Sequence, residues 1–448
     1  MCPEEPGKSI DFLPRTPAMI AAALALLCAI AYLPALNNGF ISDDYVILSR
    51  ASGSGAELSD LFRMVPERFR ITTYLAFGVL KSLFGYHAAA FYCFTILLHF
   101  ANSVLMWKLL GCVTGSLRVA VLGAMIFAVG QSPQEGVMWL AAMNEELLTL
   151  FVQATLLLWL RKRYPWSAAA CVGAFFSKEP AAVILLLLPL TEFAARRRFV
   201  VRHQILYIAV PAVVLGLVFF LSLSNNALVQ SGLYGLGGRA LLVWLNSLHR
   251  LMFPWGYLAV LLWFIVRRGV WPAGAGAGLV WMTAALLPYI FLTYQNHVPS
   301  RHMYLASIGF AWALAEIVRE IRVEKLRSVF VAALIVMNVG YLWIVKDRQY
   351  EQRAAPTSRL IQQLAGRPPE PVLVEAFPLN PWVAKETARL LPGWDPQMIR
   401  VNEPRENCPA CLILIWDPLS EQYLGRTSKL FDVYDTPPVP RRFREQTR

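Results

Sequence analysis

The sequence has little charge for its length. Asp, Glu, Lys and Arg make up 16% of its 448 residues, whereas soluble domains carry roughly 25%. Hydrophobic residues reach 57%, and long apolar runs recur along the chain. This composition excludes an ordinary soluble domain and predicts an all-α protein that crosses a lipid bilayer many times.

A glycine-rich phosphate loop and an internal repeat are also missing. The absence of the phosphate loop argues against an ATP or nucleotide-sugar site of the soluble type. The formal net charge of +12 is not a nucleic-acid signal, because most Lys and Arg residues fall in short tracts between apolar runs. We therefore expect the lipid bilayer as a partner and no nucleic acid.

Cysteine is sparse, with seven residues in the chain. Four of them lie in or beside apolar runs, where small core residues are expected. Cys408 and Cys411 form a lone C-x-x-C pair in the polar tail. Such a pair is typical of a local disulfide, half of a metal site or a redox motif. Because no second pair accompanies it, we place a local disulfide first.

The apolar runs predict about eleven membrane crossings, since a helix needs about 20 apolar residues to cross a bilayer. The first run is long for a signal peptide and lacks a clear cleavage site, so we expect it to be retained. The predicted crossings are 17–36, 88–110, 118–131, a fourth that ends at 161–163, 166–177, 181–194, 204–223, 255–267, 272–293, 303–318 and 328–345. Segments expected to lie on the membrane surface are 57–69, 71–83 and 239–253.

The cationic tracts fall in every second loop, which predicts that these loops are cytoplasmic. They lie before 16, around 108–118, and at 161–163, 196–202, 267–268 and 319–327. The intervening loops hold isolated ionisable residues, which therefore collect on the extracytoplasmic face. An odd number of crossings also places the tail outside the cytoplasm.

Three parts of the chain follow from this scheme. The tail is expected to form a small α/β domain, because 372–374 and 411–416 read as buried strands with a helix at 382–391 between them. The predicted parts are a cytoplasmic N-terminal segment, 1–16, a transmembrane domain, 17–345, with its first external loop at 37–87, and an extracytoplasmic domain, 346–448.

Several short motifs follow one another on the predicted external face. They are 40–44, 70–73 with 85–87 and 97–99, 133–139, 177–179 and 301–310. In this order they resemble the membrane part of the TPR-containing protein O-mannosyltransferases and their bacterial relatives. That family belongs to the GT-C class of glycosyltransferases, which use polyprenyl-phosphate-linked sugars. The resemblance covers roughly residues 20 to 345.

The chain departs from the family pattern at three positions. Gln131 and Gln134 stand where the family usually carries histidines, and Met143 stands where an arginine is expected. No TPR array follows the membrane part. These departures leave the sugar and the acceptor open.

The resemblance implies a GT-C fold and a glycosyltransferase that moves a hexose or pentose, in the manner of a mannosyltransferase. The donor would be a polyprenyl-phosphate sugar, and the acceptor a hydroxyl group of a protein, glycan or lipid. Transfer would take place at the extracytoplasmic face of a bacterial inner membrane.

Four residues are expected to carry this reaction, Asp43 by the resemblance and the other three by the chemistry of their side chains. Asp43 is expected to act as the base or to orient the acceptor, since a carboxylate can take the proton of a hydroxyl group. Asp44 would support it or share a Mg²⁺ or Mn²⁺ ion with it. Lys178 and Arg301 are expected at the donor phosphate. The alternative for both cations is that they extend to the membrane interface.

Further candidates for the site are Glu135, Glu145, Glu179, His302 and Tyr304. Glu145 and Glu146 also suit the start of the next helix electrostatically. Glu179 could simply pair with Lys178 or another cation. His99 lies within an apolar run and is interpreted as a structural histidine.

Two other function classes remain open from the sequence. A transporter or flippase of lipid-linked saccharides would carry polar groups near the middle of the membrane and related halves. The ionisable residues cluster near one face instead, which favours an enzyme. A catalytically inactive scaffold whose external tail binds a partner is the third alternative.

Overall fold

The computed structural model describes residues 16–51, 70–196, 205–222, 227–230, 232, 235, 237–266, 271–292 and 295–427. The surface helix predicted at 57–69 lies outside these residues. The chain divides into two compact units, Met1–Ala354 and Ala355–Arg448. We call the first the membrane unit and the second the C-terminal unit.

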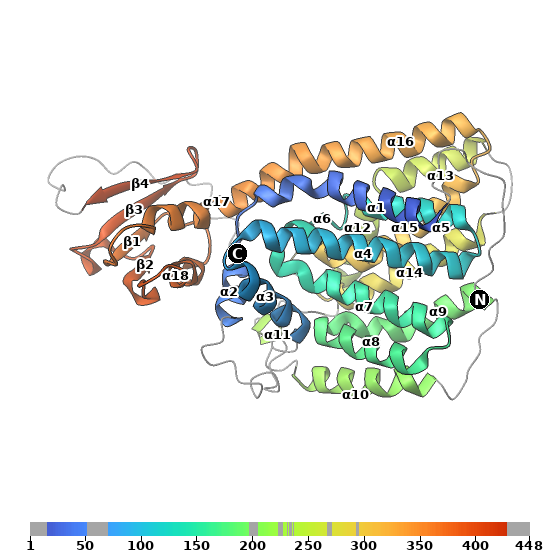
Figure 1. Ribbon diagram of the computed structural model, residues 1–448, viewed down its shortest axis with the longest axis horizontal. Helices are drawn as coiled ribbons and strands as arrows, with labels where there is room; N and C mark the ends of the chain where they lie inside the picture. The colour runs from blue at the N-terminus through green and yellow to red at the C-terminus, as the bar shows by residue number, and fades with distance from the viewer. Residues whose placement is uncertain are drawn as a thin grey trace. The chain divides into compact units, whose positions relative to one another are not determined.

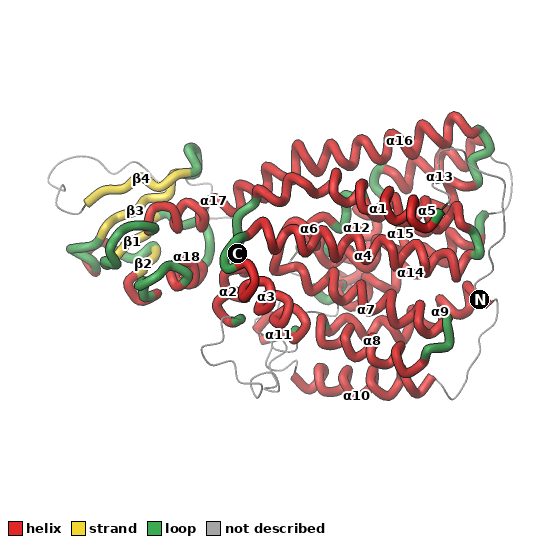
Figure 2. Tube along the Cα trace, in the orientation of Figure 1, coloured by secondary structure: helices red, strands yellow, loops and turns green. Residues whose placement is uncertain are grey.

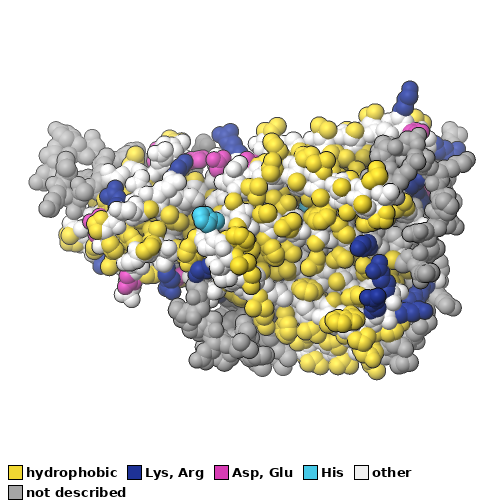
Figure 3. Space-filling view, in the orientation of Figure 1, with side chains coloured by type: hydrophobic (Ala, Val, Ile, Leu, Met, Phe, Trp, Pro, Cys, Tyr) yellow, Lys and Arg dark blue, Asp and Glu magenta, His cyan; other side chains and the backbone are white. Residues whose placement is uncertain are grey.

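The described part of the membrane unit is built from helices (Figures 1 and 2). Its α-helices are α1 (Pro17–Tyr32), α2 (Asp43–Arg50), α3 (Ile71–Phe84), α4 (Ala88–Thr114), α5 (Leu117–Ala128), α6 (Gln134–Met138), α7 (Met143–Leu160), α8 (Tyr164–Ser177), α9 (Ile184–Arg196), α10 (Leu206–Ser222), α11 (Ala227–Gln230), α12 (Gly238–Met252), α13 (Trp255–Val266), α14 (Ala273–Leu286), α15 (Tyr304–Arg319), α16 (Glu324–Tyr341) and the first part of α17 (Asp347–Leu364). Hydrophobic side chains cover most of the face of this unit in Figure 3.

Four stretches of helix in the described residues are long and apolar enough to cross a membrane. They are Pro17–Asn37, Ala88–Thr114, Leu140–Leu160 and Glu324–Leu364. Helices α12 and α13 are bent by 67° at the break between them, and they add a fifth span only if this bent pair is a single crossing. The chain is therefore a multi-pass membrane protein, and the count of about eleven crossings stays a prediction. The surface position expected for 239–253 stays a prediction.

Three of the other predicted crossings correspond to shorter apolar helices, Leu117–Ala128, Leu206–Leu217 and Ala273–Tyr289. A fourth short apolar helix, Ile71–Phe84, corresponds to the segment predicted on the membrane surface. Helix α5 stops before a polar turn at Gly130–Pro133, and α8 stops where Lys178 adopts an extended conformation. The motifs of the predicted external face at 133–139 and 177–179 therefore lie at helix ends, where the backbone leaves its regular path.

Close packing fixes the helices that carry the motifs. Helix α4 packs against α1, α5 and α7, and α15 packs against α14 (Figure 1). A Cβ atom at Gly309 of α15 would lie 2.6 Å from the carbonyl oxygen of Gly278 of α14. Only small residues permit such an approach of two helices in a membrane. This contact holds in place the start of α15, which forms most of the last motif, 301–310.

The C-terminal unit contains the small sheet that the sequence predicts. Its elements are β1 (Val372–Glu375), α18 (Pro381–Arg389), β2 (Ile399–Val401), β3 (Leu412–Asp417) and β4 (Gln422–Thr427). The strand order is β2-β1-β3-β4. Strand β1 is parallel to β2 and β3, and β4 is antiparallel to β3. The side chains of Val372, Leu373 and Val374 are all buried, so both faces of β1 are covered, as its unbroken apolar run indicates.

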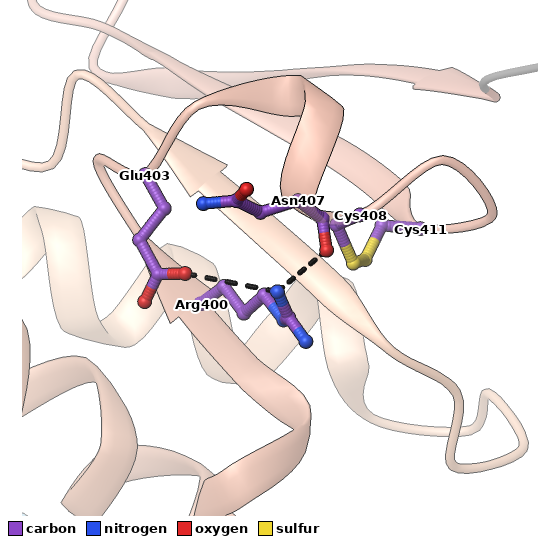
Figure 4. Close-up of a disulfide and its surroundings, with 5 residues drawn as sticks. All are labelled: Arg400, Glu403, Asn407, Cys408 and Cys411. Atoms are coloured by element: carbon purple, nitrogen blue, oxygen red, sulfur yellow. Dashed lines mark hydrogen bonds and ion pairs between the residues drawn. A yellow bond between two sulfur atoms is a disulfide. The ribbon is translucent and has the colours of Figure 1, made fainter.

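A disulfide joins Cys408 and Cys411 just before β3 (Figure 4). The local pairing expected from the sequence is thus confirmed. Arg400 donates from Nη1 to the carbonyl oxygen of Asn407 at 2.6 Å and lies 3.8 Å from Glu403. The disulfide and these contacts close the connection between β2 and β3.

Candidate functional site

The loop after α1, which we call the first external loop after its predicted side of the membrane, places the two adjacent aspartates in different environments. Ser42 has φ 43°, a conformation that residues other than glycine seldom adopt. Helix α2 begins directly after it. Asp43 is exposed, and its Oδ1 accepts a hydrogen bond from the Ser42 hydroxyl at 3.3 Å. Asp44 is fully buried. Only Asp43 can therefore meet a substrate from solution.

Asp44 ties the loop to the segment that follows α6. Its Oδ2 accepts from the backbone N–H of Ile41 at 2.7 Å, and its Oδ1 accepts from that of Ala141 at 2.6 Å. The Trp139 indole N–H donates to the carbonyl oxygen of Ile41 at 3.3 Å. Burial raises the pKa of Asp44 to about 8, although the two N–H groups and the charge of Arg353 act against this rise.

The aspartate pair does not fit a shared metal ion. Both carboxylate oxygens of Asp44 already accept backbone N–H groups inside the protein. In the described part of the chain, no group of three or more His, Cys, Asp and Glu side chains could hold a metal ion. Hard cations such as Mg²⁺ prefer several oxygen ligands, which this pair does not offer.

Lys178 lies in a second group of polar side chains, inside the membrane unit. Its ammonium group donates to Glu145 and lies 3.1 Å from Nδ1 of His302. The Tyr289 hydroxyl donates to the other oxygen of Glu145 at 2.7 Å, and His302 bonds the first. We call Glu145, Lys178, Tyr289 and His302 the buried cluster.

The buried cluster is closed and balanced in charge. The Lys178 side chain is 4% exposed and that of Glu145 is 1% exposed. The Tyr289 and His302 rings stack with centroids 4.5 Å apart, and the ammonium lies 5.2 Å from the Tyr289 centroid. Lys178 does not extend to the membrane interface, and Glu145 is a charge partner in addition to standing in the first turn of α7.

A third group surrounds Glu135. The backbone N–H of Arg301 donates to Glu135 Oε2 at 3.0 Å, and its Nη1 donates to Oε1 at 3.2 Å. Nη1 of Arg353 lies 3.5 Å from the same Oε1. Both guanidinium carbons lie against the Trp139 ring, 4.9 Å from its centroid for Arg301 and 4.8 Å for Arg353. We call Glu135, Trp139, Arg301 and Arg353 the arginine cluster.

The sequence did not point to Arg353. It lies in α17, beyond the last predicted crossing and more than two hundred residues from Glu135. The helical spacing of Tyr350, Arg353 and Ala354 is a weak signal that Arg353 lies on a helix face turned toward the protein, since Tyr350 and Ala354 are buried. That spacing marks an inward face but does not name its partner.

Glu179 pairs with an arginine and not with its neighbour Lys178. Its Oε1 lies 3.6 Å from Nη2 of Arg70. The Thr72 hydroxyl donates to that of Ser177 at 2.9 Å. These contacts attach the start of α3 to the end of α8.

Tyr304 lies in the core of the helices and not at their surface. Its hydroxyl is 2.6 Å from Nδ1 of His99 and donates to Glu146 Oε1 at 3.4 Å. Nε2 of His99 lies 3.1 Å from the carbonyl oxygen of Ala128, so His99 has structural partners on both ring nitrogens. A Cβ atom at Gly136 would lie 2.6 Å from Tyr304 Cδ2, so glycine there lets the helix of Glu135 approach α15.

The three groups are neighbours in the fold. Arg301 and His302 are consecutive, and they place one side chain in the arginine cluster and one in the buried cluster. Trp139 joins the arginine cluster to the first external loop through Ile41. The external motifs of the sequence thus converge on one region of the membrane unit.

Comparison with solved structures supports the fold. The chain is similar to ArnT from Cupriavidus metallidurans, whose structure was solved bound to undecaprenyl phosphate, with a TM-score of 0.52 and 11% identity over 90% of this chain and 94% of that one. A second similar structure is an oligosaccharyltransferase from Archaeoglobus fulgidus tethered with an acceptor peptide, with a TM-score of 0.43 and 12% identity over 85% of this chain and 64% of the other. No family model and no curated protein matches the sequence. The expected GT-C fold is confirmed.

Proposed function

We propose that the protein is a glycosyltransferase that moves a sugar from a polyprenyl-phosphate donor to a hydroxyl acceptor. The observation that carries this proposal is the exposed carboxylate of Asp43 on a loop that Trp139 joins to the arginine cluster. A base and a set of cations are the two charges that the reaction needs. The likeness of the fold to a structure that holds undecaprenyl phosphate supports a lipid phosphate as the donor's carrier.

In this mechanism Asp43 takes the proton of the acceptor hydroxyl as its oxygen attacks the anomeric carbon of the sugar. The new glycosidic C–O bond forms while the bond from that carbon to the phosphate oxygen breaks. Polyprenyl phosphate leaves with the electron pair of the broken bond, and its negative charge grows. Arg301 is proposed to stabilise this charge. Lys178, which the sequence also places at the phosphate, is already neutralised by Glu145 in the buried cluster.

Asp44 has a positioning role in this scheme. Its hydrogen bonds to Ile41 and Ala141 hold the start of α2 against the segment after Trp139. Asp43 is the preceding residue in the chain, so we propose that the same anchor fixes its direction. No step of the proposed reaction passes through a metal ion.

The proposal includes the finer features that the sequence predicts. The protein would cross a bacterial inner membrane about eleven times, with its active face and its C-terminal domain outside the cytoplasm. Mannosyl transfer is the first reaction to assay. The alternation of cationic loops supports the orientation. A label on residue 430 that reacts only from the cytoplasmic side would overturn it.

The test is transfer by Asp43→Asn with undecaprenyl-phosphate-linked mannose, and then other hexoses and pentoses, as donors. We expect the variant to remain folded in membranes and to lose about 10²–10⁴-fold in turnover, the usual contribution of a general base. Undiminished transfer by the folded variant would show that Asp43 is not the base. Translocation of the lipid without sugar transfer by the wild-type protein would identify a transporter instead.

A further inference from the structure

The arginine cluster has more positive than negative charge. Arg301 and Arg353 both contact Oε1 of Glu135, so two guanidinium groups share one carboxylate. Their side chains are 24% and 33% exposed, whereas that of Glu135 is 12% exposed. An unbalanced positive charge at an accessible place is suited to an anionic ligand.

The buried cluster offers no such excess. Lys178 and Glu145 neutralise each other, and both side chains are almost fully buried. A ligand could reach Lys178 only after that ion pair opened, and this would leave Glu145 without its cation. Charge compensation for a bound phosphate is therefore available at the two arginines and not at the lysine.

We propose that Arg301 and Arg353 together bind the phosphate group of the lipid-linked donor, with the Trp139 ring as the platform that holds both guanidiniums. This inference rests on the proposed glycosyl transfer and adds Arg353 to its binding residues. The phosphate would lie between two arginines that come from distant parts of the chain, the turn before α15 and helix α17.

The chemistry of the guanidinium group fits this role. Each guanidinium carries five N–H donors, and each meets Glu135 through Nη1. Contact with an aromatic face restricts the plane of the group, and a guanidinium can offer two parallel N–H groups to phosphate oxygens. Glu135 also bonds the backbone N–H of Arg301, so it positions the turn as well as the side chain.

The position of the pair suits the departing phosphate. The Trp139 ring contacts Arg353, and its indole N–H bonds the carbonyl oxygen of Ile41, so this arginine lies near the loop that carries the proposed base. The phosphate of the donor is a diester with one negative charge, and the polyprenyl phosphate that leaves is a monoester with nearly two. A site with excess positive charge binds the second form more strongly and therefore favours cleavage.

The experiment measures binding of undecaprenyl phosphate and of uncharged undecaprenol to the full chain in lipid nanodiscs. We expect Arg353→Gln and Arg301→Gln each to weaken binding of the phosphate about tenfold or more, because a charge-assisted contact is lost. Binding of undecaprenol should not change. The matched control is Arg348→Gln, which removes an exposed arginine from the same helix α17. It should bind both lipids as the wild-type protein does.

The outcomes separate this inference from the proposed function. If the wild-type protein binds undecaprenyl phosphate no better than undecaprenol, the lipid-phosphate donor itself is wrong. If the wild-type protein prefers the phosphate and Arg353→Gln keeps that preference, only the role of Arg353 is overturned. A variant that loses both lipids equally would show that Arg353 supports the fold, which also overturns its binding role.

Inorganic phosphate is the second probe, because a free anion could use the same two arginines. A site for the lipid headgroup predicts that inorganic phosphate displaces undecaprenyl phosphate only at a far higher concentration. Displacement at comparable concentrations would assign the pair to free phosphate.

Arg353→Lys is the last variant. It keeps the positive charge but lacks the planar guanidinium, so we expect it to bind undecaprenyl phosphate better than Arg353→Gln and less tightly than the wild-type protein.

Discussion

The buried cluster and the arginine cluster differ in charge although consecutive residues supply them. His302 belongs to the first, where Lys178 and Glu145 balance each other among aromatic rings. Arg301 belongs to the second, where two guanidiniums share Glu135 and stay partly exposed. A balanced, closed pair holds the helices together, whereas an unbalanced, open one can still bind an anion. Four variants test this difference.

The largest effect is expected from Lys178→Met. The change leaves the Glu145 carboxylate buried without its cation, and breaking a buried ion pair costs about 3–5 kcal/mol. Thermal unfolding of the purified protein in detergent measures the loss. The matched control is the double variant Lys178→Met, Glu145→Gln, which removes both charges and should recover much of the stability. If the single variant is as stable as the wild-type protein, the buried cluster is not a structural anchor.

A pH-dependent effect is expected at Asp44, which lies between the first external loop and the arginine cluster. Burial raises its pKa to about 8 in the folded protein, from about 3.9 in the unfolded chain. The folded state therefore binds the proton more tightly. The stability that Asp44 contributes is complete below pH 4 and is lost as the pH rises to 8.

Asp44→Asn should flatten this part of the profile, because the amide stays neutral at every pH. Unfolding temperatures of the two proteins from pH 5 to pH 9 make the comparison. The neighbouring Asp43→Asn is the matched control, since it removes a carboxyl group that is exposed. Parallel profiles for the wild-type protein and Asp44→Asn would contradict the prediction. They would also mean that the arginine cluster faces a permanently charged aspartate.

A smaller effect is expected from Glu146→Gln, although Glu146 is as deeply buried as Glu145. Its Oε1 accepts only a long bond from the Tyr304 hydroxyl, 3.4 Å, and its Oε2 has no hydrogen-bond partner among the described residues. The amide is the nearest neutral replacement, so we expect a change in the free energy of unfolding of about 1 kcal/mol or less. Glu145→Gln measured beside it should lose several times more, because it leaves Lys178 unpaired. Equal losses would remove the contrast between these neighbours.

Much of the fold follows from the sequence by simple rules. Apolar runs locate most helices, and the strands β1 and β3 show as short apolar segments in a polar tail. The lone C-x-x-C pair indicates its own disulfide, because no other pair competes for it. The number of crossings is harder, since α5 and α14 are shorter than a bilayer requires and a run of apolar residues does not show where the helix breaks.

The site could be predicted only in part. The sequence groups the external motifs, but Lys178 and Arg301 are both isolated cations near helix ends and look equivalent in it. Their difference arises from partners far away in the chain: Glu145 and Tyr289 for the first, Arg353 for the second. The same holds for the aspartates. The conformation of Ser42 and the N–H of Ala141 decide which one is buried, and neither can be read from the local pattern.

The smallest effect on stability is expected from Arg353→Gln. This variant separates the arginine cluster from the buried cluster most clearly, because it should change binding and not stability. This side chain is 33% exposed and lies 3.5 Å from Glu135, and pairs of this kind contribute about 1 kcal/mol or less in the presence of solvent. Arg301 still accompanies Glu135 in the variant, so no buried charge is left alone. Unfolding in detergent should therefore resemble that of Arg348→Gln, while lipid-phosphate binding falls. A large loss of stability would place Arg353 with Lys178 as a structural cation.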